Sequence, residues 1–182
     1  MKKQDTSLVL IAVLMIIAAA LSRVFFYPVN YSPVIAMALF GGSVIKNKNI
    51  AFALPLFAML LSDIMFEVFN VAQGFWGWGQ VIGYGILAVI TILGFKLRKI
   101  NVVNVLGFSI ASSLIFFFLS NSSVWLFDAT TYSRNAAGYI NCLAAGLPFL
   151  EKGLIVDAAF SAIFFGGFVL LERFAFRKAV VA

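Results

Sequence analysis

Residues 102–119 read VVNVLGFSIASSLIFFFL, an apolar run of 18 residues that contains no charged side chain. A helix rises about 1.5 Å per residue, so roughly 20 such residues are needed to cross the hydrocarbon core of a bilayer. Transmembrane β-strands are shorter and alternate strictly between apolar and polar residues, which this run does not. The run therefore predicts a transmembrane helix.

Five further runs of similar character predict an all-α, polytopic membrane protein with about six transmembrane helices in a single domain, residues 1–182. The chain is 63% hydrophobic and 11% charged, against roughly 45–50% and 25% in soluble domains. The first run follows Lys2 and Lys3 as a signal peptide would, but it lacks a cleavage motif and is predicted to span the membrane. The predicted spans cover about 8–27, 31–46, 50–69, 80–97, 102–119 and 152–172.

The basic residues are predicted to gather on one side of the membrane. With the amino terminus inside, ten of the 13 Lys and Arg residues fall in inner segments, and only Arg23, Arg134 and Lys152 fall outside. Cytoplasmic segments of membrane proteins are enriched in Lys and Arg, so both termini are predicted to be cytoplasmic. The net charge of +6 divides into about +8 inside and −2 outside, so it reflects topology and nucleic acid is not an expected partner.

The predicted outer connections are longer than the inner ones, and the connection over residues 120–152 is too long to be a plain linker. Within it, residues 134–147 have helical periodicity but are too few to cross a bilayer, and Gly138, Asn141 and Gly146 interrupt them. They predict a short extra helix that is either re-entrant or on the outer surface. We expect the function of the protein to lie at this outer face.

Three charged residues, Arg23, Asp63 and Asp157, each lie about one turn inside the outer end of a predicted span. A charge at a helix centre costs roughly 2.5–3.5 kcal/mol on insertion scales, so such residues face the bundle and find partners. The sequence therefore predicts an ion-pair network among the three, which either locks the helices together or contacts a ligand. The alternative is that these side chains extend to the nearby lipid headgroups. Glu67 follows Asp63 at i+4, a spacing that fits a cation site, a proton relay or a solvated helix end.

Aromatic and amide side chains dominate the two longer outer connections. Trp76 and Trp78 alternate with glycines, and Trp125 lies in the other connection. Interfacial aromatic belts explain such residues, but flanking glycines would also let the backbone fold into a lid that presents indole faces to a ligand. Uncharged hydrogen-bonding groups suited to orienting a ligand in an apolar cavity are Asn30, Asn121, Asn135 and Asn141.

The sequence contains no histidine and one cysteine, Cys142, which is predicted to be a buried thiol. It also lacks a phosphate-binding G-x-x-x-x-G-K-[ST] loop, an H-E-x-x-H motif and a G-x-S-x-G motif. We expect no enzyme activity, no cofactor and no metal site, and any transport driven by ATP would require other chains. Ala38 and Gly42 form a small-residue pair that indicates close helix packing, inside the bundle or against another subunit.

Four segments resemble an uncharacterised bacterial family of candidate transport proteins. These segments are NYSPVIAMALFGG (30–42), LPLFAMLLSD (54–63), SNSSVW (120–125) and GYINCLAAGLPF (138–149). That family is similar to the S components, the substrate-binding subunits of energy-coupling-factor (ECF) vitamin transporters. The resemblance implies a six-helix S-component-like bundle in the cytoplasmic membrane, with a vitamin-sized solute bound beneath outer loops and a coupling subunit and two ATPases as partners.

The leading hypothesis is an uptake protein that binds a vitamin-like organic solute at its outer face and moves it inward. The predicted site lies between the outer ends of the first, third and sixth spans. The alternative is a structural or assembly protein of the membrane whose outer loops bind a protein partner, and an intramembrane enzyme that uses Asp63 and Asp157 is a distant third. The predicted solute-binding residues are Arg23, Asn30, Asp63, Glu67, Trp76, Trp78, Asn121, Trp125, Asn135, Asn141 and Asp157.

Overall fold

The computed structural model describes residues 6–25, 32–75, 77–128 and 130–181, and all regular structure within these ranges is helical. The prediction of an all-α fold is confirmed. The helices are α1 (Thr6–Phe25), α2 (Val34–Val44), α3 (Lys48–Val68), α4 (Trp78–Gly94), α5 (Val102–Phe127) and α6 (Ala136–Val181).

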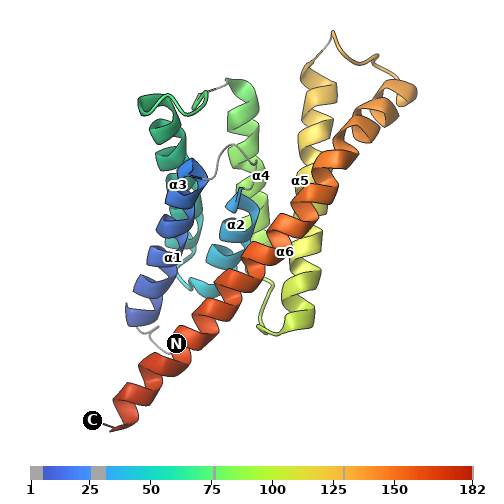
Figure 1. The fold of residues 1–182 in the computed structure, drawn as a ribbon. Helices are drawn as coiled ribbons and strands as arrows, with labels where there is room; N and C mark the ends of the chain where they lie inside the picture. The colour runs from blue at the N-terminus through green and yellow to red at the C-terminus, as the bar shows by residue number, and fades with distance from the viewer. Residues whose placement is uncertain (1–5, 26–31, 76, 129, 182) are drawn as a thin grey trace.

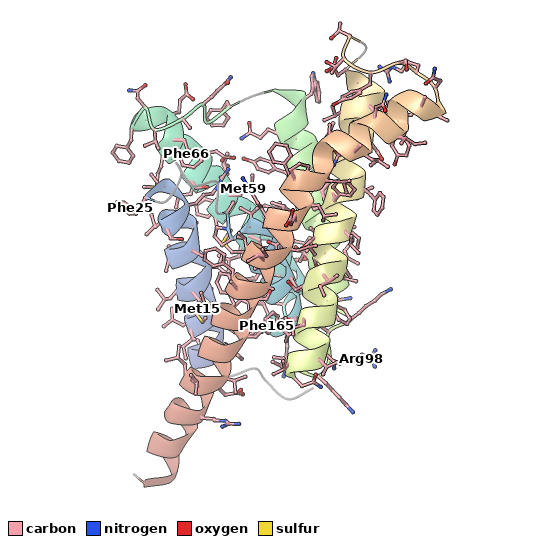
Figure 2. The ribbon with its side chains drawn as sticks, turned by 45° about the vertical axis from the view of Figure 1, so that its right-hand side comes forward. Met15, Phe25, Met59, Phe66, Arg98 and Phe165 are labelled. Carbon is pink, nitrogen blue, oxygen red and sulfur yellow. The ribbon has the colours of Figure 1, made fainter. Side chains whose placement is uncertain are left out.

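Successive helices run in alternating directions along the bundle (Figure 1). The start of α1, the end of α6 and the α2–α3 and α4–α5 connections therefore lie at one end, from which Arg98 extends in Figure 2. The basic residues with described side chains at this end, which we call the basic end, are Lys46, Lys48, Lys96, Arg98, Lys99 and Arg173. The α3–α4 and α5–α6 connections lie at the opposite end.

Helix α2 is the centre of the bundle and contacts each of the other five helices. Ten of its 11 residues are buried, which agrees with a sequence that is apolar on every side. The ring of Phe40, at 0% exposure, packs against three rings of α6, with centroids 5.2 Å from Phe164, 5.3 Å from Phe165 and 5.7 Å from Phe168. At about 1.5 Å per residue α2 is about 16 Å long, roughly half of a bilayer's hydrocarbon thickness.

Three described helices are long and apolar enough to cross a membrane: α3, α5 and the part of α6 from Ala136 to Arg173. Helices α1, α2 and α4 contribute shorter apolar segments, Val9–Phe25, Val34–Val44 and Trp78–Gly94. The outside of the bundle exposes large apolar side chains such as Leu14, Val103 and Ile163, as lipid contact requires. By the length and composition of its helices, the chain is a multi-pass membrane protein.

The prediction of a separate short outer or re-entrant helix over residues 134–147 is wrong, because α6 continues without interruption from Ala136 to Val181. Glycine costs a helix only about 1 kcal/mol, which packing easily offsets. A Cβ on Gly138 would lie 2.0 Å from the Ser133 carbonyl oxygen, and one on Gly146 would lie 2.5 Å from the Asn121 side chain. These glycines therefore permit close contact and do not end the helix.

The prediction of a long outer connection over residues 120–152 is also wrong. Helix α5 continues to Phe127 and α6 begins at Ala136, so only residues 128–135 connect them. Asp128 accepts hydrogen bonds from the hydroxyl groups of Thr131 (2.6 Å) and Thr130 (2.8 Å) in this connection. These bonds hold the pKa of the exposed Asp128 carboxyl well below its usual range.

The small-residue pair predicted on α2 packs within the bundle. A Cβ on Gly42 would lie 2.2 Å from the carbonyl oxygen of Thr91 on α4, and one on Gly94 would lie 2.6 Å from that of Leu39. Only glycine fits there, since backbone meets backbone and neither side can rotate away.

We predict that Gly42→Ala destabilises the protein by about 1–3 kcal/mol, because the added methyl group forces α2 and α4 apart. Thermal unfolding of the purified protein in detergent measures the change. The matched control is Gly107→Ala on α5, where an added Cβ meets no atom within 4 Å, and its melting temperature should be unchanged or slightly raised. Equal melting temperatures for both variants would contradict the close contact.

Candidate functional site

A buried ion pair joins α1 to α3 near the end opposite the basic end. Nη1 of Arg23 lies 2.5 Å from Oδ1 of Asp63 and donates a second hydrogen bond to Ser62 Oγ at 2.7 Å. The Asp63 side chain is 1% exposed and that of Arg23 is 15% exposed. The guanidinium carbon also lies 4.7 Å from the ring centre of Phe66, within the range of a cation–π contact.

The second carboxylate oxygen of Asp63 receives two hydrogen bonds from α4. Nε2 of Gln80 and the hydroxyl of Tyr84 each donate to Oδ2 at 2.7 Å. Gln80 Nε2 also lies 3.0 Å from the carbonyl oxygen of Gly74 in the α3–α4 connection. We call Arg23, Ser62, Asp63, Gln80 and Tyr84 the Asp63 cluster, and it fastens α1, α3 and α4 to one carboxylate.

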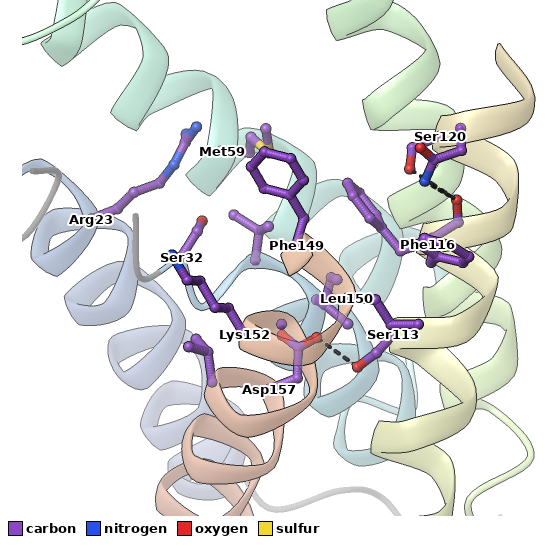
Figure 3. Close-up of a pocket in the computed structure, with 16 residues that line it drawn as sticks. Arg23, Ser32, Met59, Ser113, Phe116, Ser120, Phe149, Leu150, Lys152 and Asp157 are labelled. Carbon is purple, nitrogen blue, oxygen red and sulfur yellow. Dashed lines mark hydrogen bonds between the residues drawn. The ribbon is translucent and has the colours of Figure 1, made fainter. Parts of the chain in front are cut away.

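A cavity of about 340 Å³ lies next to this cluster, between α5 and α6 on one side and α1, α2 and α3 on the other (Figure 3). Its walls are mostly apolar and aromatic, with polar groups at separate places, as in many small-molecule sites. We call it the central cavity. It is lined by Arg23, Ser32, Val34, Ile35, Met59, Ser113, Phe116, Phe117, Ser120, Asn121, Phe149, Leu150, Lys152, Gly153, Val156 and Asp157.

One wall of the central cavity holds a buried carboxylate. Asp157, at 2% exposure, accepts a hydrogen bond from Ser113 Oγ of α5 at 2.7 Å, drawn as a dashed line in Figure 3. One turn further toward the basic end, Ser161 of α6 donates to Ser109 of α5 at 3.3 Å. Serine hydroxyls therefore hold α5 and α6 together beneath Asp157, as interhelical hydrogen bonds do in membranes.

Another wall is formed by Ser32 and the start of α2. Ser32 Oγ is buried and has no hydrogen-bond partner among the described residues. The N-cap residue of α2, Pro33, provides no side-chain cap, and the first backbone hydrogen bond of the helix runs from Met37 to Pro33 at 2.8 Å. Amides in the first turn of a helix have no acceptor within the helix, so this wall presents donors and a partial positive charge.

The structure brings three of the eleven predicted binding residues to the central cavity: Arg23, Asn121 and Asp157. Asp63 does not line the cavity, but it is paired with Arg23, which does. The predicted network of all three charged residues is wrong in one member, because Asp157 is hydrogen-bonded to Ser113 and forms no ion pair with Arg23. The sequence places the three residues at a similar depth in their spans. However, α1 and α3 meet on one side of the cavity, and α6 passes on the other side.

Trp125 and Asn135 lie elsewhere, at a more open hollow of about 430 Å³ near the α5–α6 connection. Trp125 Nε1 donates to the Ser133 carbonyl at 3.0 Å, and its ring packs edge-on against Tyr139 at 5.2 Å. The Asn135 side chain accepts from the Gly138 amide at 2.9 Å near the start of α6. In this structure both residues hold the connection in place, and neither forms a wall of the central cavity.

Three other predicted residues lie outside the central cavity. The Glu67 carboxylate accepts a hydrogen bond from the Gly74 amide at 3.0 Å and so fixes the α3–α4 connection to the end of α3. Trp78 is 82% exposed at the start of α4, and Asn141 is exposed on α6. Asn30 and Trp76 lie outside the described residues.

Sequence reasoning missed Ser32, Ser113 and Lys152 as cavity residues. The sequence predicts Lys152 only as an outer charge and gives no role to Ser32 or Ser113. The available signal was the scarcity of outer basic residues, because Lys152 is one of three and stands five residues before Asp157 on the same predicted span. Cys142 is buried at 2% exposure, as predicted, and its thiol lies 3.4 Å from the Asn121 carbonyl.

Across the described ranges, no three His, Cys, Asp or Glu side chains come close enough together to hold a metal ion.

We predict that Arg23→Met destabilises the protein by about 3–5 kcal/mol, because it leaves the Asp63 carboxylate buried and uncompensated. The double variant Arg23→Met/Asp63→Leu should be closer to wild type than Arg23→Met alone, since no charge then remains unpaired. Unfolding temperatures in detergent measure both effects. If the double variant is destabilised by the sum of the losses measured for Arg23→Met and for Asp63→Leu, the two residues do not compensate one another.

Comparison with known proteins places the chain in a family. The model of the family of unknown function DUF6580 matches residues 2–179, nearly the whole chain, and the protein therefore belongs to that family. No curated protein and no solved structure matches it significantly.

Proposed function

We propose that this member of DUF6580 binds a small organic solute in the central cavity and moves it inward across the membrane, as an S component of an ECF-type transporter does. The observation that carries the proposal is the cavity itself, which places the buried Asp157 carboxylate among apolar and aromatic walls. An ionisable residue within a membrane segment is costly, and it is a functional-site hypothesis by default.

The charged residues of the cavity differ in how well packing alone explains them. Arg23 is paired with Asp63 and serves helix association whether or not a solute binds. Asp157 has a neutral hydroxyl as its hydrogen-bond partner, and a hydrophobic residue would fill the same space between α5 and α6 at lower cost. Packing alone therefore explains Asp157 less well than Arg23, and a role in solute binding would account for its presence.

The size of the cavity favours a compact solute. Small-molecule sites commonly measure about 300–1,000 Å³, and the central cavity, at about 340 Å³, is near the lower limit. Aromatic walls from Phe116, Phe117 and Phe149 suit an apolar or planar body. A corrinoid such as cobalamin would extend far outside this volume.

The direction of uptake follows from the charge distribution. The cavity lies toward the end opposite the basic end, and basic segments of membrane proteins face the cytoplasm. This orientation places both termini in the cytoplasm and opens the cavity to the outside of a bacterial cytoplasmic membrane. The sequence has no nucleotide-binding loop, so a coupling subunit and ATPases would supply the energy.

The second candidate function is a structural or assembly role in the membrane. The observation that favours it is the hollow at the α5–α6 connection, where Trp125, Tyr139 and Arg134 are grouped at the tip of the bundle. Aromatic and arginine side chains are the residues enriched at protein interfaces. A protein partner bound at this tip, with the central cavity dispensable, would favour this role over solute binding.

We predict that Gly153→Phe abolishes solute binding and that Gly166→Phe does not. Both glycines lie on α6 and an added Cβ meets no atom within 4 Å at either, but only Gly153 lines the central cavity. Native mass spectrometry of the protein purified from its own host would identify the solute that remains bound. We expect wild type and Gly166→Phe to retain it and Gly153→Phe to lose it.

Two results would contradict solute binding in this cavity. One is a wild-type protein that carries no solute after gentle purification. The other is a Gly153→Phe variant that is folded, as judged by an unchanged melting temperature, and still carries the same solute.

We predict that Trp78 faces the outside and Lys99 the cytoplasm. In a Cys142→Ser background, which has no other cysteine, Trp78→Cys should react with a membrane-impermeant maleimide in intact cells, because residue 78 is exposed at the end opposite the basic end. Lys99→Cys, exposed at the basic end, should react only after the membrane is permeabilised. The reverse pattern would overturn the proposed direction of uptake.

A further inference from the structure

Two side chains of opposite charge line the central cavity and have no ionic partner among the residues that the structure describes. Asp157 is 2% exposed, and the bond it receives comes from the neutral hydroxyl of Ser113. Lys152 lies at the rim, and it takes part in none of the hydrogen bonds or ion pairs found among the described residues. The third charged residue of the lining, Arg23, is already neutralised by Asp63 at 2.5 Å.

The two unpaired charges do not compensate one another. Lys152 and Asp157 are five residues apart on α6, whereas side chains on one helix meet at spacings of three or four. In Figure 3 the Lys152 side chain runs toward the side of the cavity where Ser32 lies, while Asp157 points to Ser113 on α5. The cavity therefore has a negative wall and a positive rim that are separate from each other.

The positive rim is reinforced by neutral donors. Ser32 Oγ is buried and finds no hydrogen-bond partner in the described part of the chain, and the uncapped start of α2 contributes Val34 and Ile35 to the same cavity. Buried polar groups are nearly always hydrogen-bonded, so an unpaired hydroxyl beside a cavity indicates a place for an acceptor atom. In several secondary transporters, half-helices that begin at the substrate site point their amino-terminal ends at anionic groups of the substrate.

We infer that the solute of the central cavity is dipolar: it carries an ammonium group that pairs with Asp157 and a carboxylate that pairs with Lys152 and Ser32, joined by an apolar body that contacts Phe116, Phe117 and Phe149. Amino acids and related zwitterions have this chemistry. The inference rests on the proposed solute-binding function and specifies the class of solute.

The separate negative and positive groups of the cavity favour a dipolar solute over a singly charged one. A cation alone would neutralise Asp157 and leave Lys152 without a partner, and an anion alone would do the reverse. A zwitterion neutralises both and adds no net charge to the site. The gain is largest at Asp157, which is buried, whereas Lys152 is exposed.

Binding of matched compounds to the wild-type protein in lipid nanodiscs tests the inference. The probes are the common amino acids, the amine that corresponds to each after removal of the carboxyl group, and the acid that corresponds to each after removal of the amino group. Thermal unfolding ranks the probes, and titration calorimetry gives their dissociation constants. We expect at least one amino acid to bind at least about tenfold more tightly than its own amine and its own acid.

Two charge-neutralising variants assign the two groups. Asp157→Asn should weaken the binding of the amino acid and of its amine at least about tenfold and leave the binding of the acid unchanged. Lys152→Gln should weaken the binding of the amino acid and of its acid and leave the binding of the amine unchanged. Glu151→Gln is the matched control, because Glu151 is exposed next to Lys152 but does not line the cavity. It should bind every probe as wild type does.

Several outcomes would overturn the dipolar class. These are an amine, an acid or a neutral compound that binds as tightly as the amino acid, charge variants that weaken all probes equally, or no amino acid that binds. In each of these cases the proposed function is still tested separately. That test is whether wild type retains a solute that Gly153→Phe loses. A retained solute with a single charge would leave solute binding intact and remove only the present inference.

Discussion

The buried pair of Arg23 and Asp63 is the interaction on which the rest of the bundle depends. Both oxygens of the carboxylate are used, one by Arg23 of α1 and the other by Gln80 and Tyr84 of α4. An ion pair taken out of water contributes little net stability, but removal of one partner is strongly destabilising, so the pair specifies which helices meet. The α3–α4 connection is attached to the same carboxylate through Gln80, whose Nε2 donates both to Asp63 Oδ2 at 2.7 Å and to the Gly74 carbonyl oxygen at 3.0 Å.

The length of α2 determines where the central cavity lies. An 11-residue helix that is surrounded on all sides fills about half of the membrane thickness. The space beyond its start is bounded by the halves of α1, α3, α5 and α6 that lie away from the basic end. The Asp63 cluster fastens α1 to α3 on one side of this space, and the serine contacts hold α5 to α6 on the other side. The cavity is therefore a consequence of one short helix inside a bundle of longer ones.

The sequence predicted the helical class, most helix positions and the burial of charges near one end, because apolar length and the scarcity of charge are local properties. It predicted the Arg23–Asp63 contact as part of a network, and it erred on Asp157 because depth along a helix does not say which side of the bundle the helix occupies. It also treated Gly138 and Gly146 as interruptions of α6. Those glycines are explained only by neighbours distant in sequence, the Ser133 carbonyl and the Asn121 side chain.

The sequence by itself determined that this protein lies in a membrane and that ten of its 13 basic residues belong to one end. The physical reason is that transfer of side chains between water and hydrocarbon depends on composition and spacing alone. Only the tertiary structure decided that Lys152 and Ser32 share a cavity with Asp157 while Trp78 and Trp125 do not. Which side chains share a cavity depends on how helices turn about their axes and pack, and that is fixed by contacts among residues far apart in the chain.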